Sequence, residues 1–74
     1  MDKDLLTRAH AFADASLKDS WEYTYKVYFT RNPINNDLRY KGRKYFFVYH
    51  NTHTICKAFK TQAELHDYLT SYGF

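Results

Sequence analysis

Cysteine, glycine and proline are scarce in this sequence, and these scarcities exclude several classes of protein. The single cysteine, Cys56, rules out an internal disulfide and with it the framework of a small secreted domain. The two glycines, Gly42 and Gly73, lie far apart, which excludes a glycine-rich loop that cradles phosphate. No apolar run approaches the ~20 residues that cross a bilayer, and the charged N-terminal segment lacks the apolar stretch of a signal peptide. We therefore expect a soluble, cytoplasmic protein without a membrane partner.

The length of the chain limits how much core it can build. Its 74 residues predict a single domain spanning residues 1–74. A core of this size supplies about 3–5 kcal/mol of net stability when no disulfide or metal reinforces it. A homodimer would be one way to extend so small a core.

The first predicted element is a helix over about residues 4–17. Alanines raise its intrinsic propensity, and Asp2 or Asp4 can cap its N-terminus. Its apolar stripe recurs at helical spacing through Leu5, Ala9, Phe12, Ala13 and Ser16. Lys18, Asp19 and Ser20 then break the pattern, so the helix should end before them.

A second helix is predicted over about residues 62–72. Thr61 and Glu64 have the spacing of a capping box, and Gly73 stands where a glycine commonly ends a helix. Phe59, just before the cap, is expected to pack on this helix. The expected apolar stripe consists of Leu65, Tyr68 or Leu69, and Tyr72.

Three strands are predicted between these helices. Residues 21–30 alternate with period two and place Trp21, Tyr23, Tyr25, Val27 and Phe29 on one face, which we expect to be a core face. Residues 43–50 and 52–59 read as a hairpin that turns at Asn51 and Thr52, with a register uncertain by one residue. The order α-β-β-β-α predicts an α+β fold, with two helices packed on a three-stranded antiparallel sheet.

Residues 31–42 are predicted to form a long loop, because Asn32-Pro33 and Asn35-Asn36-Asp37 favour turns. Residues 31–44 carry five cations against Asp37 alone, which gives this segment a charge of +4. Such a cluster attracts phosphates or acidic protein surfaces, although a solvated loop is its commonest explanation. Long loops in compact domains tend to be functional or disordered.

Metal binding and catalysis receive little support from the sequence. His50 and His53 would face each other across a two-residue turn, but Cys56 would then point to the other face of its strand. Cys56 itself reads as a small apolar residue packed in a strand. No pair of carboxylates, metal motif or activated nucleophile is evident, so we expect a protein that is not an enzyme and has no cofactor, catalytic residue or metal site.

Aromatic and basic residues together suggest a binding surface. Ten of the fifteen aromatic residues fall between Trp21 and Tyr49, in and around the basic segment. Single-stranded nucleic acids bind to aromatic platforms beside cationic grooves. The segment Lys41–Val48 nevertheless fails to match the RNA-recognition signature. The candidate residues for binding nucleic acid or another partner are Arg31, Arg39, Tyr40, Lys41, Arg43, Lys44, Tyr28, Tyr45 and Tyr49.

The opposite interpretation places nearly all these aromatic residues in the core, with one helix covering each face of the sheet. The face of the sheet that the two helices cover decides between the two interpretations. The run Tyr45–Tyr49 is apolar or amphipathic on both faces. Such a strand is either covered on both sides or presents aromatic side chains to a partner. We expect Tyr28, Tyr40 and this run to be more than core packing requires.

The sheet followed by a capped helix that begins with Phe59, Thr61, Glu64 and Leu65 resembles two groups of proteins. One comprises the AP2-type and recombinase arm-binding DNA modules, which read a duplex with the face of a sheet. The other comprises small phage-encoded proteins, including some anti-CRISPR proteins. The resemblance implies either binding to nucleic acid or a nucleoprotein complex, or inhibition through protein–protein contact. A homo-oligomeric interaction module is a further alternative, and no functional residue is carried over from either group.

Overall fold

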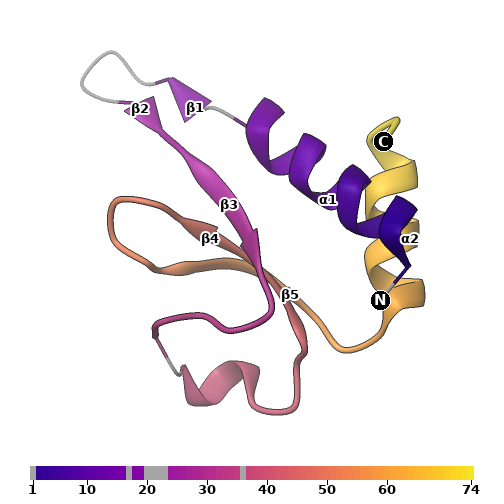
Figure 1. Ribbon diagram of the computed structural model, residues 1–74. Helices are drawn as coiled ribbons and strands as arrows, with labels where there is room; N and C mark the ends of the chain where they lie inside the picture. Colours follow the sequence, from indigo (N-terminus) through magenta and orange to yellow (C-terminus); the bar gives the residue numbers. More distant parts are fainter. Residues whose placement is uncertain (1, 17, 20–23, 36) are drawn as a thin grey trace.

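An antiparallel sheet with the strand order β3-β4-β5 forms the centre of the fold (Figure 1). The structure is a computed structural model that describes residues 2–16, 18–19, 24–35 and 37–74. The predicted α+β fold with the order α-β-β-β-α is confirmed. Its main elements are α1 (Lys3–Ala15), β3 (Val27–Thr30), β4 (Tyr45–Tyr49), β5 (Ile55–Phe59) and α2 (Gln62–Ser71).

Both helices pack on the same face of the sheet (Figure 1). They run in the same direction, since Arg8 of α1 lies beside His66, and Phe12, one turn later, lies beside Tyr72. The core that they enclose with the sheet contains Leu5, Ala9, Ala13, Phe29, Tyr45, Phe47, Phe59, Leu65 and Leu69. We call this side of the sheet the helix face. The predicted apolar stripe of α1 is confirmed.

The helix ends follow from local side-chain chemistry. Asp2 caps α1, because its Oδ1 accepts a hydrogen bond of 2.9 Å from the backbone N–H of Asp4. Leu17, predicted to lie at the end of this helix, is outside the described residues. Thr61 caps α2 by accepting a bond of 3.2 Å from the N–H of Glu64. The Glu64 carboxylate reaches back as predicted, but it accepts from the N–H of Lys60 instead of the N–H of Thr61.

Gly73 ends α2 in the predicted way. Its φ of 83° lies in the left-handed region that glycine adopts readily. Its N–H donates to the carbonyl of Thr70 at 3.0 Å, and the N–H of Phe74 donates to the carbonyl of Leu69 at 2.9 Å, which completes a Schellman motif. The stripe of α2 is buried at Leu65 and Leu69. Tyr72 was expected to belong to this stripe, but it is 60% exposed and lies outside the core.

The predicted strand over residues 21–30 is wrong in its extent. Lys26 separates β3 from β2 (Thr24–Tyr25), which pairs instead with β1 (Lys18–Asp19) in a separate two-stranded ribbon. Helix α1 ends at Ala15, before Lys18 and Asp19 as predicted, and these two residues form a strand. The expected core positions Trp21 and Tyr23, and the side chain of Tyr25, lie outside the described residues.

The hairpin between β4 and β5 turns through residues 50–54, so the predicted two-residue turn at Asn51 and Thr52 is wrong. His53 adopts the left-handed conformation, with a φ of 56°. Its N–H donates to the carbonyl of Tyr49 at 2.8 Å, and the N–H of Tyr49 donates to the carbonyl of Thr54 at 2.9 Å. The wider loop moves the positive φ away from Thr52, whose branched side chain resists it.

A β-bulge shifts the pairing of β4 with β5 after Phe47. Lys57 pairs with Phe47, yet Ile55 pairs with the next residue, Val48, which leaves Cys56 as the extra residue. Cys56 is exposed, so the expectation that it packs inside a strand is wrong. Ile55, on the N-terminal side of the bulge, therefore lies on the opposite face of the sheet from the one that simple alternation along β5 predicts.

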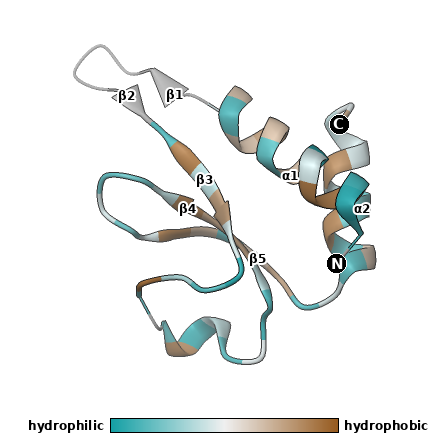
Figure 2. Ribbon diagram, viewed as in Figure 1, coloured by the Kyte–Doolittle hydropathy of each residue, from teal (hydrophilic) through white to brown (hydrophobic). Residues whose placement is uncertain are grey.

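The second face of the sheet is covered by the loop that joins β3 to β4. Phe46, Val48 and Ile55 are buried there, and Tyr28, Tyr40 and Ala58 pack against them. Tyr40 belongs to a short 3-10 helix, η1 (Leu38–Tyr40), so the predicted loop is not wholly irregular. We call this side the loop face. Figure 2 shows the loop as mostly hydrophilic, with hydrophobic segments in it and in η1.

This arrangement settles the role of the run Tyr45–Tyr49. Its first four residues are buried, with Tyr45 only 5% exposed, because the helices cover one face and the loop covers the other. The expectation that core packing does not require this run is wrong. Neither helix in the described part of the chain is long and apolar enough to cross a membrane.

Candidate functional site

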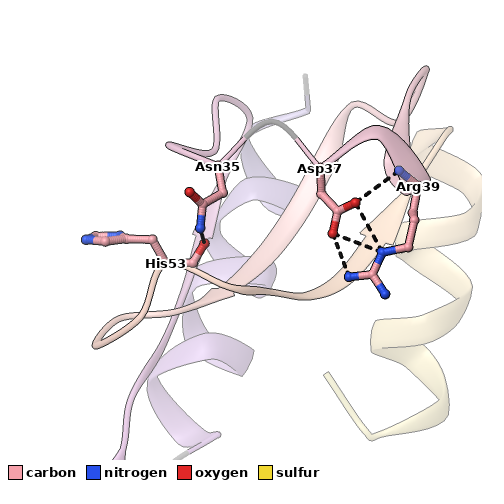
Figure 3. Close-up of polar contacts among 4 residues, drawn as sticks. All are labelled: Asn35, Asp37, Arg39 and His53. Atoms are coloured by element: carbon pink, nitrogen blue, oxygen red, sulfur yellow. Dashed lines mark hydrogen bonds and ion pairs between the residues drawn. The ribbon is translucent and has the colours of Figure 1, made fainter.

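A carboxylate holds the middle of the loop in place (Figure 3). Asp37 caps η1, since its Oδ1 accepts a bond of 3.0 Å from the backbone N–H of Arg39. The same carboxylate binds the guanidinium of Arg39 through both oxygens, with Oδ2 at 2.6 Å from Nη2. These hydrogen bonds from the Arg39 side chain and backbone lower the pKa of Asp37 below its ordinary value of 3.8. Arg39 is therefore paired with an anion inside its own loop.

The pairing has two consequences for the site. The guanidinium of Arg39 lies over the ring of Tyr40, 5.7 Å from its centroid, and this contact helps to fix η1. The carboxylate of Asp37 raises the pKa of Arg39, mainly through the side-chain hydrogen bond, so Arg39 remains a cation. Its charge is nevertheless offset locally, which makes Arg39 a weaker candidate for binding anions than the other cations of the loop.

A second tie joins the loop to the tip of the hairpin. The side-chain amide of Asn35 donates to the backbone carbonyl of His53 at 3.0 Å (Figure 3). The imidazole Nδ1 of His53 lies 3.0 Å from the hydroxyl of Tyr28, whose ring also contacts that of His50. Tyr28 of β3, predicted to bind a partner, thus contacts the tip of the hairpin.

A cleft opens between the loop and the loop face of the sheet. Its volume is about 470 Å³, within the range of ~300–1,000 Å³ typical of ligand sites. Tyr40, Phe46 and Ile55 contribute apolar surface, and Leu38 stands at the cleft with 84% of its surface exposed. Asn32 and Asn35 add amide groups to the same lining.

A polar hollow of about 330 Å³ adjoins this cleft and is lined by Arg31, Asn32, Arg43 and Lys44. Arg31, Asn32 and Arg43 also line the cleft, so the two spaces are continuous. The guanidinium of Arg31 sits over the ring of Tyr45, 5.6 Å from its centroid. Arg43 approaches Glu64 only loosely, at 3.8 Å. The hollow therefore gathers three cations around one point on the surface.

The structure brings together part of the predicted site and separates the rest. Arg31, Tyr40, Lys41, Arg43 and Lys44 surround the cleft and the hollow. Tyr45 lies on the helix face below Arg31, and its burial contradicts its expected exposure to a partner.

Tyr49 is also separated from the cleft. It pairs with Val27 on the helix face and lines a different hollow together with Cys56. A hydrogen bond with Cys56 is the main cause that raises the pKa of Tyr49.

Sequence reasoning missed two residues of this site. Leu38 is an exposed aliphatic residue that lines the cleft, and Asn32 contributes to both spaces, whereas Ile34 is exposed on the same loop but lines neither space. A signal for Leu38 was available, because Ile34 and Leu38 interrupt an otherwise polar segment. Leu38, exposed beside the cations at the cleft, is therefore a candidate contact residue.

The histidines do not assemble into a metal centre. The rings of His50 and His53 lie 6.5 Å apart between centroids. Within residues 2–16, 18–19, 24–35 and 37–74, no group of three His, Cys, Asp or Glu residues could hold a metal ion.

Comparison of the chain with protein-family models, with curated proteins and with solved structures finds no match.

Proposed function

We propose that this protein is a non-catalytic binding protein that engages nucleic acid through the cationic hollow and the adjoining cleft. The observation that carries the proposal is the convergence of Arg31, Arg43 and Lys44 on one polar hollow. Guanidinium and ammonium groups grouped in this way bind the phosphates of a nucleic acid backbone.

The distribution of charge supports this proposal. Four of the five cations of residues 31–44 lie at the cleft or the hollow without the tight pairing that holds Arg39 to Asp37. A cationic surface on a chain with a net charge of +3 attracts a polyanion through long-range electrostatics.

A second candidate function is contact with a protein, such as a nucleic-acid-handling complex or a second copy of the chain. The exposure of Leu38 (84%) and Ile34 (69%) favours it, because aliphatic side chains beside arginine are common in protein interfaces. A complex of this kind should depend on both aliphatic residues and respond weakly to salt.

Titration of labelled oligonucleotides, single-stranded and duplex, tests the principal proposal by fluorescence anisotropy. Affinity should fall steeply between about 50 and 200 mM salt, because binding releases counterions from the phosphates. Lys44→Gln should reduce the slope of log K against log salt by about 1 if Lys44 contacts one phosphate.

Lys3→Gln is the matched control, since it removes the same charge from an exposed position at the start of α1. The control should leave the salt slope almost unchanged. Absence of binding by every oligonucleotide at low salt would overturn the proposal. Equal slopes for Lys44→Gln and Lys3→Gln would show that the hollow is not the site.

A further inference from the structure

The cleft and the hollow differ in chemistry although they share part of their lining. The hollow is lined only by three cations and an asparagine, whereas the cleft adds to its charged residues the rings of Tyr40 and Phe46 and the aliphatic chains of Leu38 and Ile55. A ligand with an anionic group next to an apolar ring would match both linings. A nucleotide has this combination, with a phosphate and a base separated by one sugar.

We infer that the cleft receives one unpaired nucleobase while the cationic hollow holds the phosphate next to it. This inference rests on the proposed function and makes it more specific, because it names single-stranded nucleic acid as the ligand. A base in a duplex is stacked on both sides and paired at its edge, so it cannot enter a cleft of this kind.

The polar groups of the cleft suit the edge of a base. The amide of Asn35 is held in position by its bond to the carbonyl of His53, and its Oδ1 can accept from an amino group (Figure 3). The amide of Asn32 lies where the cleft meets the hollow. Amide groups can both donate to and accept from base edges.

The site is also organised before a ligand binds. Asp37 fixes η1 and the guanidinium of Arg39, and the ring of Tyr40 packs against the loop face. A site that is already ordered loses less conformational entropy on binding. The hydrogen bonds of Asp37 and the packing of Tyr40 therefore reduce the ordering that binding of a base would require.

The test uses three labelled probes of about ten nucleotides, the length bound by a small single-strand site. They are a mixed-sequence single strand, the same backbone with abasic sites in place of every base, and a duplex of that sequence. Fluorescence anisotropy at one low salt concentration should show the single strand binding roughly tenfold more tightly than either other probe, as expected when one base stacks.

Leu38 and Ile34 provide a matched pair of variants, because both are exposed aliphatic residues of the same loop but only Leu38 lines the cleft. Leu38→Ala should weaken binding of the single strand several-fold and leave binding of the abasic probe unchanged. Ile34→Ala should leave both unchanged. Circular dichroism of each variant checks that the fold is retained.

The possible failures are distinguishable. If the abasic and duplex probes bind as tightly as the single strand, the base site is overturned while recognition of phosphate stands. If Leu38→Ala and Ile34→Ala reduce binding equally, the cleft is again not the base site. If no probe binds, the proposed function fails and this inference fails with it.

Discussion

The two faces of the sheet are both buried, but by different means. Two helices cover the helix face, where Phe47, Leu65 and Leu69 are fully buried. A loop with one short 3-10 helix covers the loop face and leaves a cleft of about 470 Å³ beside Phe46 and Ile55. The helix face thus consists mainly of close packing, while the loop face combines packing with a lined space and a cluster of cations.

This difference teaches how a small chain can carry a binding surface. A helix satisfies its own backbone hydrogen bonds, so its buried stripe can be wholly apolar. A loop must use side chains and turns for its polar groups, as Asp37 and Asn35 do. The side chains that hold the loop in place therefore also lie where a ligand would bind.

Large-to-small substitutions should produce the largest difference in stability between the two faces. Leu69→Ala, at a position with no exposed surface, should destabilise the protein by about 5 kcal/mol, because helix packing cannot collapse into the cavity. Ile55→Ala, beside the open cleft, should destabilise by only about 2 kcal/mol, because the loop or water can fill the space.

Urea unfolding followed by circular dichroism measures both losses. A core of this size supplies about 3–5 kcal/mol in total, so the Leu69 variant should show no folded baseline while the Ile55 variant retains one. Equal destabilisation at the two positions would mean that the loop packs as rigidly as the helices.

The two glycines offer the next comparison, because Gly42 lies in the loop and Gly73 follows the end of α2. Gly42 (φ 85°) and Gly73 (φ 83°) have no atoms within 4 Å of an added Cβ, so alanine would add conformational strain without a clash. Each substitution should cost about 1–2 kcal/mol, measured by urea unfolding. Only Gly42→Ala should weaken binding of an oligonucleotide, because Gly42 lines the cleft and precedes Arg43. If both variants bind the oligonucleotide equally well, the turn at Gly42 is not needed for binding.

Alkaline unfolding examines the helix face by itself. The pKa of Tyr68 is raised from 10.0 to about 12. Burial is the largest cause, and a hydrogen bond with Tyr72 is the second. Because the folded state keeps this proton more tightly than the unfolded state, stability should be intact below pH 10 and decline between pH 10 and about 12. The partly exposed ring is screened by solvent, so the decline should be smaller than the loss in the glycine variants.

The urea midpoint measured from pH 9 to pH 12 tests this expectation. Tyr68→Phe should flatten the decline. Tyr28→Phe makes the same substitution on the loop face and should leave the slope unchanged. An identical slope in the Tyr68→Phe variant and the unmodified protein would contradict the argument.

Local patterns were sufficient to predict the two helices, but not that both pack on the same face of the sheet. The stripes of Leu5, Ala9 and Ala13 and of Leu65 and Leu69 recur at helical spacing, and the caps lie next to them in the sequence. These features depend on residues within a few positions of one another. The α+β order of the fold followed from them together with the alternation in the strands.

The loop face could not be predicted in the same way. The sequence showed that Tyr45–Tyr49 is apolar on both faces, but the second cover depends on Tyr40 folding back onto Phe46 and Ile55. The bulge at Cys56 and the left-handed His53 likewise depend on how two strands meet. The basic loop was recognised as a candidate site from its charge, whereas the cleft and the position of Leu38 in its lining required the folded chain.

The pair formed by Asp37 and Arg39 gives the smallest and most specific comparison within the loop face. The pKa of Asp37 lies below 3.8, so its carboxylate is ionised and paired near neutral pH and loses the pairing only in more acidic solution. Asp37→Asn should keep the cap, since asparagine caps helices as well, but release the charge of Arg39 beside the cleft. Oligonucleotide binding should then rise roughly two- to threefold at low salt, with an unchanged midpoint of thermal unfolding. Arg39→Gln should weaken binding by a similar factor, because it leaves the carboxylate of Asp37 uncompensated at the cleft, and Lys44→Gln should weaken binding as well. Weaker binding by Asp37→Asn would instead show that the carboxylate matters by holding η1, and that the cleft depends on this pair for its shape.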